Sequence, residues 1–133
     1  MQSYLNIVGD ILTKGQIKKN RTGVDTIVID GAMFKHDMQE GFPILTTKKM
    51  ATKIIRVELE GFIKGITDKK WYQERGCNIW NEWGNPQMAP YGHDEQSRKR
   101  MAEERDLGPI YGWQWRHFGA EYKGHDADYS GEG

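Results

Sequence analysis

The distribution of aliphatic side chains is the feature that most constrains the fold of this sequence. Of its 21 Ile, Leu and Val residues, 19 lie at or before Ile79, which leaves only Leu107 and Ile110 for the last 54 positions. Burial of apolar surface is the main favourable contribution to folding, so the later segment cannot form a core of its own. We expect it to pack on the earlier segment or on other protein.

Composition predicts a folded chain with a thin core and excludes several classes of protein. Leu, Ile, Val and Phe make up just under 19% of the 133 residues, but 19 basic residues balance 19 acidic ones, so disorder is not expected. No apolar run is long enough for a membrane span, and zero net charge gives no general attraction to nucleic acid. The single cysteine, Cys77, suits a reducing compartment, and no metal-ligand spacing is present. We expect a cytoplasmic protein without a membrane, metal or specific nucleic-acid partner.

Periodicity in the first part predicts a helix followed by a β-hairpin. The apolar positions of the helix are Tyr4, Val8, Ile11 and Leu12. Gly15 is placed to end it, and residues 26–29 are β-branched and predict a strand. Asp30-Gly31 favours a tight type I′ turn, which predicts a return strand over residues 32–38.

The longest predicted helix spans residues 48–64, with Thr46 or Thr47 as its N-cap and Gly65 at its end. Its apolar stripe comprises Ile54, Ile55, Leu59, Phe62 and Ile63. Glu58 projects into this stripe. A carboxylate there is costly unless it is paired or protonated, and such acids concentrate at functional sites. A structural salt bridge to Arg21 or to a lysine is the alternative, and the pattern leaves both open.

The later part predicts short elements and loops. Residues 67–73 favour another helix, and residues 84–105 favour a surface insertion made of a loop and a polar helix. Trp80 and Trp83 lie three positions apart, where they either stack on a flat heterocycle or join the core. Residues 124–133 show no closing element.

Three further residues have a functional and a plain interpretation. Arg21 lies in a basic turn where it could meet an anion, although a solvated surface arginine is the commoner case. Tyr111 lies between Gly-Pro and Gly, where it either approaches a ligand or bonds locally. Cys77 has no His or Asn arranged beside it and is interpreted as structural. Patterns alone thus predict a mixed α/β domain and name no reaction.

Several stretches nevertheless resemble the thymidylate synthase family, in the family's order and over nearly the whole chain. They are residues 21–23, 41–49, 58–59, 79–83 and 106–116, continued by residues 117–122 and 128–131. The resemblance implies an α/β (α+β) thymidylate synthase-like fold in which a mixed sheet packs against helices and forms a homodimer interface. Residues 1–133 would be the N-terminal part of that single domain.

The resemblance also implies a reaction: reductive methylation of dUMP to dTMP with the co-substrate 5,10-methylenetetrahydrofolate, which leaves dihydrofolate. In the family a cysteine thiolate adds to the pyrimidine and so divides a difficult substitution into easier steps. Carried over to this sequence, Glu58 would organise the proton network, Tyr111 would stand near the nucleophile, and Arg21 would bind the dUMP phosphate. The residues implied for folate are Ile79, Trp80, Asn81 and Lys48.

Three departures from the family pattern keep a second activity open. The family usually has His where Ala51 stands, Trp where Gly61 stands, and Asp where Asn81 stands. Loss of the His removes a contact expected toward folate. A deoxypyrimidine nucleotide (dCMP or dUMP) hydroxymethylase, which uses the same folate, is the alternative within the enzyme class.

The family nucleophile belongs to a Pro-Cys-His-type segment that has no counterpart in this sequence, and Cys77 does not match it. We therefore expect the 133-residue chain to be an N-terminal portion that does not catalyse alone. A non-catalytic binding or assembly fragment is the alternative from another functional class.

Overall fold

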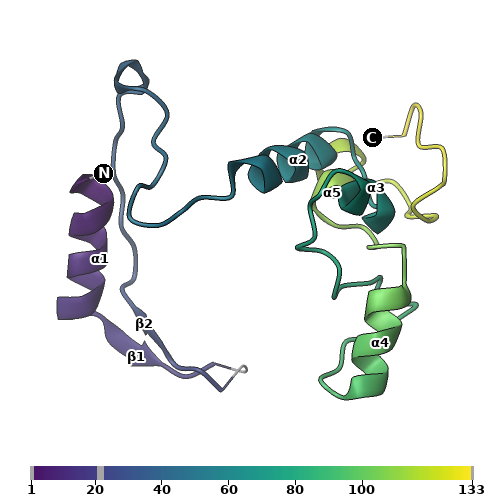
Figure 1. Ribbon diagram of the computed structural model, residues 1–133, viewed down its shortest axis with the longest axis horizontal. Helices are drawn as coiled ribbons and strands as arrows, with labels where there is room; N and C mark the ends of the chain where they lie inside the picture. The colour runs from purple at the N-terminus through teal and green to yellow at the C-terminus, as the bar shows by residue number, and fades with distance from the viewer. Residues whose placement is uncertain (1, 21–22, 133) are drawn as a thin grey trace. The chain divides into compact units, whose positions relative to one another are not determined.

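The computed structural model describes residues 2–20 and 23–132, and it divides into two compact units. The first unit comprises Met1–Met50 and the second comprises Ala51–Gly133. Figure 1 shows the elements of each unit. Among the described residues the elements are helices and one two-stranded antiparallel sheet, which is compatible with the predicted α+β class.

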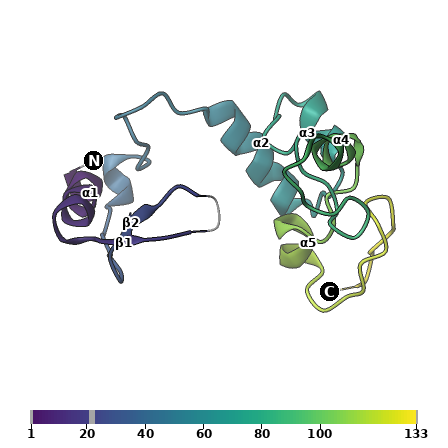
Figure 2. The ribbon, with the colours of Figure 1, turned by 90° about the horizontal axis from the view of Figure 1, so that it is seen from below.

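The first unit contains helix α1 (Gln2–Lys14) and strands β1 (Gln16–Lys18) and β2 (Thr26–Val28). The predicted first helix is confirmed: it ends where Gly15 donates its N–H to the Ile11 carbonyl at 2.9 Å. The two strands are antiparallel, with Ile17 opposite Ile27, and they lie side by side in Figure 2. No described residue of this unit is buried.

The predicted hairpin across Asp30-Gly31 is wrong. Strand β2 pairs with β1, and residues 31–37 form no regular secondary structure before the short 3₁₀ helix η1 (Met38–Glu40). A type I′ turn needs positive φ at both central residues, whereas neither Asp30 nor Gly31 adopts a positive φ. The chain therefore continues past Asp30 without turning back.

The second unit begins with helix α2 (Thr52–Ile63), which is shorter than the predicted range 48–64. Its N-cap is Ala51, which has no side-chain oxygen to accept from the first turn, so neither predicted threonine cap is used. The next helix, α3 (Lys69–Glu74), begins as predicted, because the Asp68 carboxylate accepts a hydrogen bond from the Lys70 N–H at 2.9 Å.

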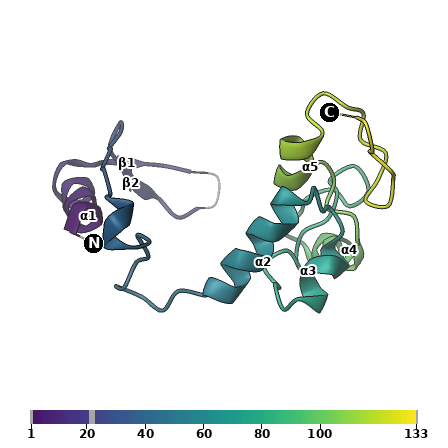
Figure 3. The same ribbon diagram turned by 90° about the horizontal axis from the view of Figure 1, so that it is seen from above.

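The core of the second unit lies where α2 and α3 meet the segment after residue 105, as Figure 3 shows. Its buried residues are Val57, Tyr72, Cys77 and Leu107. Tyr72 is fully buried, and its hydroxyl donates to the Ile66 carbonyl at 3.0 Å. A Cβ added to Gly61 would lie 2.4 Å from the Tyr72 ring, so the tyrosine fills the space beside this glycine.

A short antiparallel bridge joins the start of α3 to the chain after residue 104. Lys69 N–H donates to the Arg105 carbonyl and Leu107 N–H donates to the Thr67 carbonyl, both at 2.9 Å. The Arg105 guanidinium also binds both carboxylate oxygens of Asp68, at 2.7 and 2.6 Å. The two ends of the intervening segment are therefore held together.

The segment 84–105 contains the predicted polar helix, α4 (Glu95–Glu103), capped by Asp94. It is not only surface: Asn85, Ala89, Ser97 and Met101 are buried. Leu107 and Trp113 bring the later segment into the core as well, although few aliphatic residues follow Ile79. Hence the later segment packs on the earlier one, as its composition predicts.

The last helix is α5 (Tyr111–Arg116), and residues 117–132 cover it without regular secondary structure. Trp113 of this helix packs against Tyr122 and Tyr129, with ring centroids 5.5 and 6.1 Å apart. The Tyr122 hydroxyl bonds to Thr67 and to the carboxylate of Asp106. Over the described residues, no helix has the length and apolar character that a membrane crossing needs.

Candidate functional site

Glu58 lies on α2 as predicted, half-buried, and burial raises the pKa of its carboxyl above the ordinary value. An interaction with the Trp80 indole N–H partly offsets this rise, because a donor favours the charged carboxylate. The Trp80 Nε1 atom is buried, and its contact with Glu58 does not have the geometry of a hydrogen bond, so the interaction is weak. None of the described lysines or arginines forms an ion pair with Glu58, which removes the lysine salt bridge as an explanation.

Three aromatic rings meet beside this carboxylate. Phe62 of α2 lies one turn beyond Glu58, and its ring centroid is 6.3 Å from that of Trp80 and 5.3 Å from that of Tyr111. Trp80 and Tyr111 are 6.2 Å apart, so the three rings form a closed triangle. Tilted and edge-to-face contacts of this kind are the favourable ones for aromatic pairs. The structure thus brings Glu58, Trp80 and Tyr111 together from three separate segments.

A pocket of about 460 Å³ opens beside the rings. Its lining residues are Trp80, Trp83, Pro109, Ile110, Tyr111 and Gln114. Tyr111 is the first residue of α5 and is 58% exposed, so its ring is available to a ligand. Small-molecule sites commonly have this size and an aromatic lining with few polar groups. The pocket therefore suits a flat heterocycle.

The other residues predicted for folate differ in their placement. Ile79 is exposed and flanks Trp80 in the turn of residues 79–83. The Asn81 side-chain oxygen accepts a hydrogen bond from Gln73 of α3 at 3.0 Å, which orients its amide toward α3. Lys48 is exposed at a bend in the first unit, whereas Ile79, Trp80 and Asn81 belong to the second. Arg21 lies outside the described residues.

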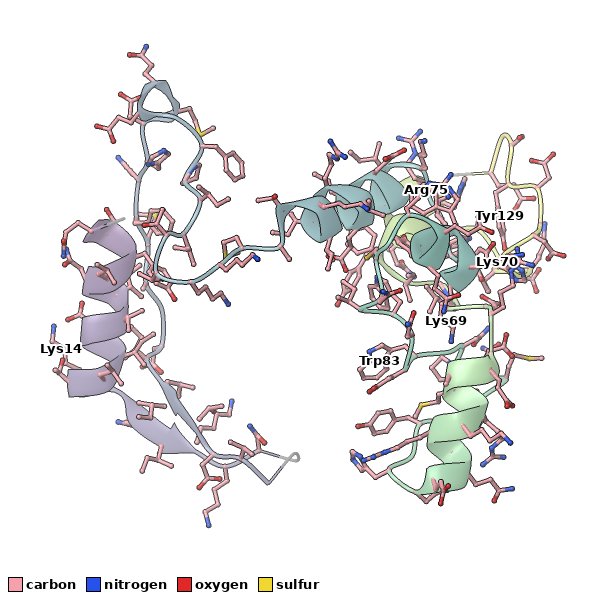
Figure 4. All side chains as sticks on the ribbon, viewed as in Figure 1. Lys14, Lys69, Lys70, Arg75, Trp83 and Tyr129 are labelled. Atoms are coloured by element: carbon pink, nitrogen blue, oxygen red, sulfur yellow. The ribbon has the colours of Figure 1, made fainter. Side chains whose placement is uncertain are left out.

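Lys69 is a buried residue of this region that sequence reasoning missed. Its side chain is on α3 and is only 2% exposed, and Figure 4 labels it together with its exposed neighbour Lys70 and with Trp83. The ammonium group donates to four main-chain carbonyls, those of Asn81, Trp83, Met101 and Ala102, at 3.4, 2.7, 2.8 and 3.0 Å. Burial lowers the pKa of Lys69, and the negative charge of Glu104 opposes that change. No local pattern marks Lys69, because Lys70 beside it has the same side chain.

Cys77 is structural, as the sequence predicts. It is fully buried in the core, and burial raises the pKa of its thiol. A neutral, enclosed thiol is a poor nucleophile, because the thiolate is the reactive form. Among the described residues, no group of His, Cys, Asp and Glu could hold a metal ion.

The sequence profile of the thymidylate synthase family matches residues 2–131. This chain belongs to the thymidylate synthase family. It is 43% identical to bifunctional dihydrofolate reductase-thymidylate synthase 1 of Arabidopsis thaliana over 98% of its own length and 24% of the relative's. Over the same share of the chain, it is 40% identical to thymidylate synthase of Homo sapiens and 41% identical to that of Herpesvirus ateles, covering 40% and 43% of those proteins. The chain therefore spans less than half of the length of these relatives.

One departure from the thymidylate synthase pattern has a physical explanation. The Trp expected in the family is Gly61 here, and the Tyr72 ring occupies the space into which a side chain at this position would extend. Tyr72 on α3 thus fills the space that a large side chain at position 61 of α2 would need. Ala51, where the family has His, is the N-cap residue of α2.

Proposed function

We propose that this chain supplies the Glu58 part of a thymidylate synthase site, for the reductive methylation of dUMP to dTMP with 5,10-methylenetetrahydrofolate. One observation carries the proposal. A half-buried carboxyl with a raised pKa lies against the Trp80 indole, beside an aromatic pocket that also contains Tyr111. Acids with this kind of perturbation, located at a pocket, are typical of catalytic sites.

Glu58 would move protons in this reaction. A carboxyl whose pKa is raised toward neutral pH exchanges a proton more readily than an ordinary glutamate does, and this matches the demands of general acid–base catalysis. The protons would pass to and from the pyrimidine carbonyl and the folate nitrogen. Trp80 would flank the reacting carbon and exclude water, and Tyr111 would stand near the nucleophile.

The folate, when bound, supplies the one-carbon unit and the hydride. Ile79 and Trp80 would form the wall that its heterocycle meets, with Asn81 at the end of that wall. The pocket volume and the aromatic lining support this assignment. Lys48 would meet the carboxylates of the folate tail, and Arg21 would bind the dUMP phosphate through its planar guanidinium.

The thiolate that the reaction needs would come from outside these residues. Cys77 is the only cysteine of the chain, and its thiol is buried and neutral. We therefore propose that the chain alone forms no dihydrofolate from dUMP and 5,10-methylenetetrahydrofolate. Dihydrofolate formed above the background rate would contradict this proposal.

Ligand binding tests the site without requiring turnover. We expect 5,10-methylenetetrahydrofolate to quench the tryptophan fluorescence of the chain, and Trp80→Ala to weaken its binding roughly tenfold, the loss typical of one stacked ring. Binding that is unchanged by Trp80→Ala would overturn the assignment of the pocket.

The same site would serve a deoxypyrimidine nucleotide hydroxymethylase, the alternative that the departures at Ala51, Gly61 and Asn81 leave open. Product analysis of the complete enzyme separates the two activities, since only methylation yields dihydrofolate.

For the complete enzyme we propose a homodimer in the cytoplasm, testable by sedimentation and by cell fractionation. A chain that binds neither dUMP nor folate would instead be an assembly fragment.

A further inference from the structure

Residues 84–105 and the aromatic wall of the pocket share one buried cation. The Lys69 ammonium donates to the Trp83 carbonyl at 2.7 Å and to the Asn81 carbonyl at 3.4 Å, and both belong to the turn that carries Trp80. It also donates to the carbonyls of Met101 and Ala102, at 2.8 and 3.0 Å, in the last turn of α4. The turn that carries Trp80 and the end of α4 are thus joined at a single nitrogen atom.

The chemistry of helix ends explains the α4 half of this arrangement. The last four carbonyls of an α-helix have no partner within the helix, and they carry the negative end of its dipole. In α4 the Arg100 carbonyl accepts from the Glu104 N–H at 2.9 Å, whereas those of Met101 and Ala102 accept from Lys69. The ammonium therefore satisfies one buried and one part-buried acceptor and carries the charge that the helix end favours.

The position of Lys69 on α3 determines how its bonds to the turn that carries Trp80 and Trp83 affect the pocket. Lys69 lies in the first turn of α3, whose backbone is fixed by the Asp68 cap and by the bond from Lys69 N–H to the Arg105 carbonyl. The ammonium is therefore a fixed point, and the Trp83 carbonyl bonded to it cannot move independently. Because Trp80 and Trp83 both line the pocket, the shape of the pocket depends on this bond.

We propose that Lys69 is a positioning residue for the pocket, which couples the end of α4 to the Trp80–Trp83 wall and so makes residues 84–105 part of the ligand site. The ligand class, a flat reduced folate, rests on the proposed function. The coupling itself rests on the four carbonyl contacts and on the burial of the lysine. Residues 84–105 are thus more than a surface insertion.

The test compares Lys69→Met with Lys70→Met, in which the neighbouring exposed lysine changes and the buried one stays. Indole N–H signals in the NMR spectrum of the full chain report on each tryptophan, with Trp80→Phe and Trp83→Phe assigning the two of interest. We expect Lys69→Met to shift the signals of Trp80 and Trp83 and to leave those of Trp113 and Trp115 on α5 in place. We expect Lys70→Met to shift none of the four.

Ligand affinity is the second measurement, with folic acid as a stable probe of the pocket. We expect Lys69→Met to weaken folic acid binding roughly tenfold and Lys70→Met to leave it unchanged. If the native chain does not bind folic acid, the proposed function fails at this pocket, while the indole signals still decide the coupling.

Two results would overturn the coupling. In one, the Trp80 and Trp83 signals do not move in Lys69→Met. In the other, the signals of Trp113 and Trp115 move together with those of Trp80 and Trp83, which would show a general loosening of the unit. If Lys69→Met does not fold, Lys69→Arg replaces it. Arg keeps the charge but is bulkier than the ammonium, so the same two signals are expected to shift by a smaller amount.

Discussion

The two units of this chain differ in a way that their compositions do not suggest. Residues 1–50 contain 12 of the 21 Ile, Leu and Val residues, yet none of the described ones is buried. Residues 51–133 contain the other nine and all of the described buried residues. The number of aliphatic side chains in a segment therefore does not predict how many of its residues are buried.

The second unit replaces aliphatic burial with aromatic packing and buried hydrogen bonds. Tyr72 and Trp113 are buried rings. The Asp106 carboxylate accepts hydrogen bonds from Tyr122 O–H, from Asn85 Nδ2 at 3.3 Å and from Gly108 N–H at 2.7 Å. Buried polar groups rigidify a structure when every member is satisfied. A few such groups hold a unit that contains few aliphatic side chains.

Hydrogen exchange is expected to show the largest difference between the units. Amides of α1 should exchange at least roughly a hundredfold faster than those of α2 and α3, because opening α1 exposes little buried surface. Exchange followed by mass spectrometry of peptides from 2–14 and 52–74 measures both. Equal protection would show that the first unit is stabilised by packing that its own residues do not provide.

Asp106→Ala should destabilise the second unit by about 3 kcal/mol, because it removes the acceptor of the buried Asn85 and Gly108 donors and of the half-buried Tyr122 hydroxyl. All five tryptophans lie in the second unit, so urea unfolding followed by their fluorescence reports on that unit alone. Asp126→Ala removes an exposed carboxylate of the same unit and should cost less than about 0.5 kcal/mol. Similar losses for both variants would argue against the buried network.

Sequence reasoning succeeded where a structural feature depends on neighbours in the chain. The end of α1 at Gly15, the Asp68 cap of α3 and the half-buried position of Glu58 all follow from spacing within one or two turns. The role of Lys69 could not be predicted, because its acceptors lie 12 to 33 residues away. The pairing of β2 with β1 was not predicted, because Asp30-Gly31 favoured a tight turn and hence pairing of β2 with residues 32–38.

Gly61→Ala tests the packing of α2 on α3. The added methyl group would lie 2.4 Å from the Tyr72 ring, so we expect a loss of about 1–3 kcal/mol in urea unfolding. In a Tyr72→Leu background the same change should cost clearly less, because the smaller side chain leaves room for the methyl group. Equal costs in both backgrounds would mean that the two positions do not share this volume.

The smallest expected effect concerns pH, and it has opposite signs for two residues of α2. Burial raises the pKa of Glu58 above 4.5, so the folded chain binds this proton more tightly than the unfolded chain. Its contribution to stability is therefore present below pH 4.5 and is lost as pH rises through the higher folded value. Lys64 lowers the pKa of Glu60, so its contribution is present above pH 4.5 and is lost as pH falls.

Unfolding of Glu58→Gln and Glu60→Gln at a series of pH values measures both contributions. Glu58→Gln should remove a downward slope of stability with rising pH, and Glu60→Gln should remove an upward one. Slopes of the same sign would contradict the burial of Glu58.

The bridge between the start of α3 and the chain at Arg105 closes a long loop. Arg105 and Asp68 are 37 positions apart, and the bridge fixes both ends of that loop. The entropy of closing a loop grows only with the logarithm of its length, so doubling the loop costs about 0.6 kcal/mol. Family members can therefore lengthen or shorten this loop at little thermodynamic cost, provided that the closing contacts between its ends are kept.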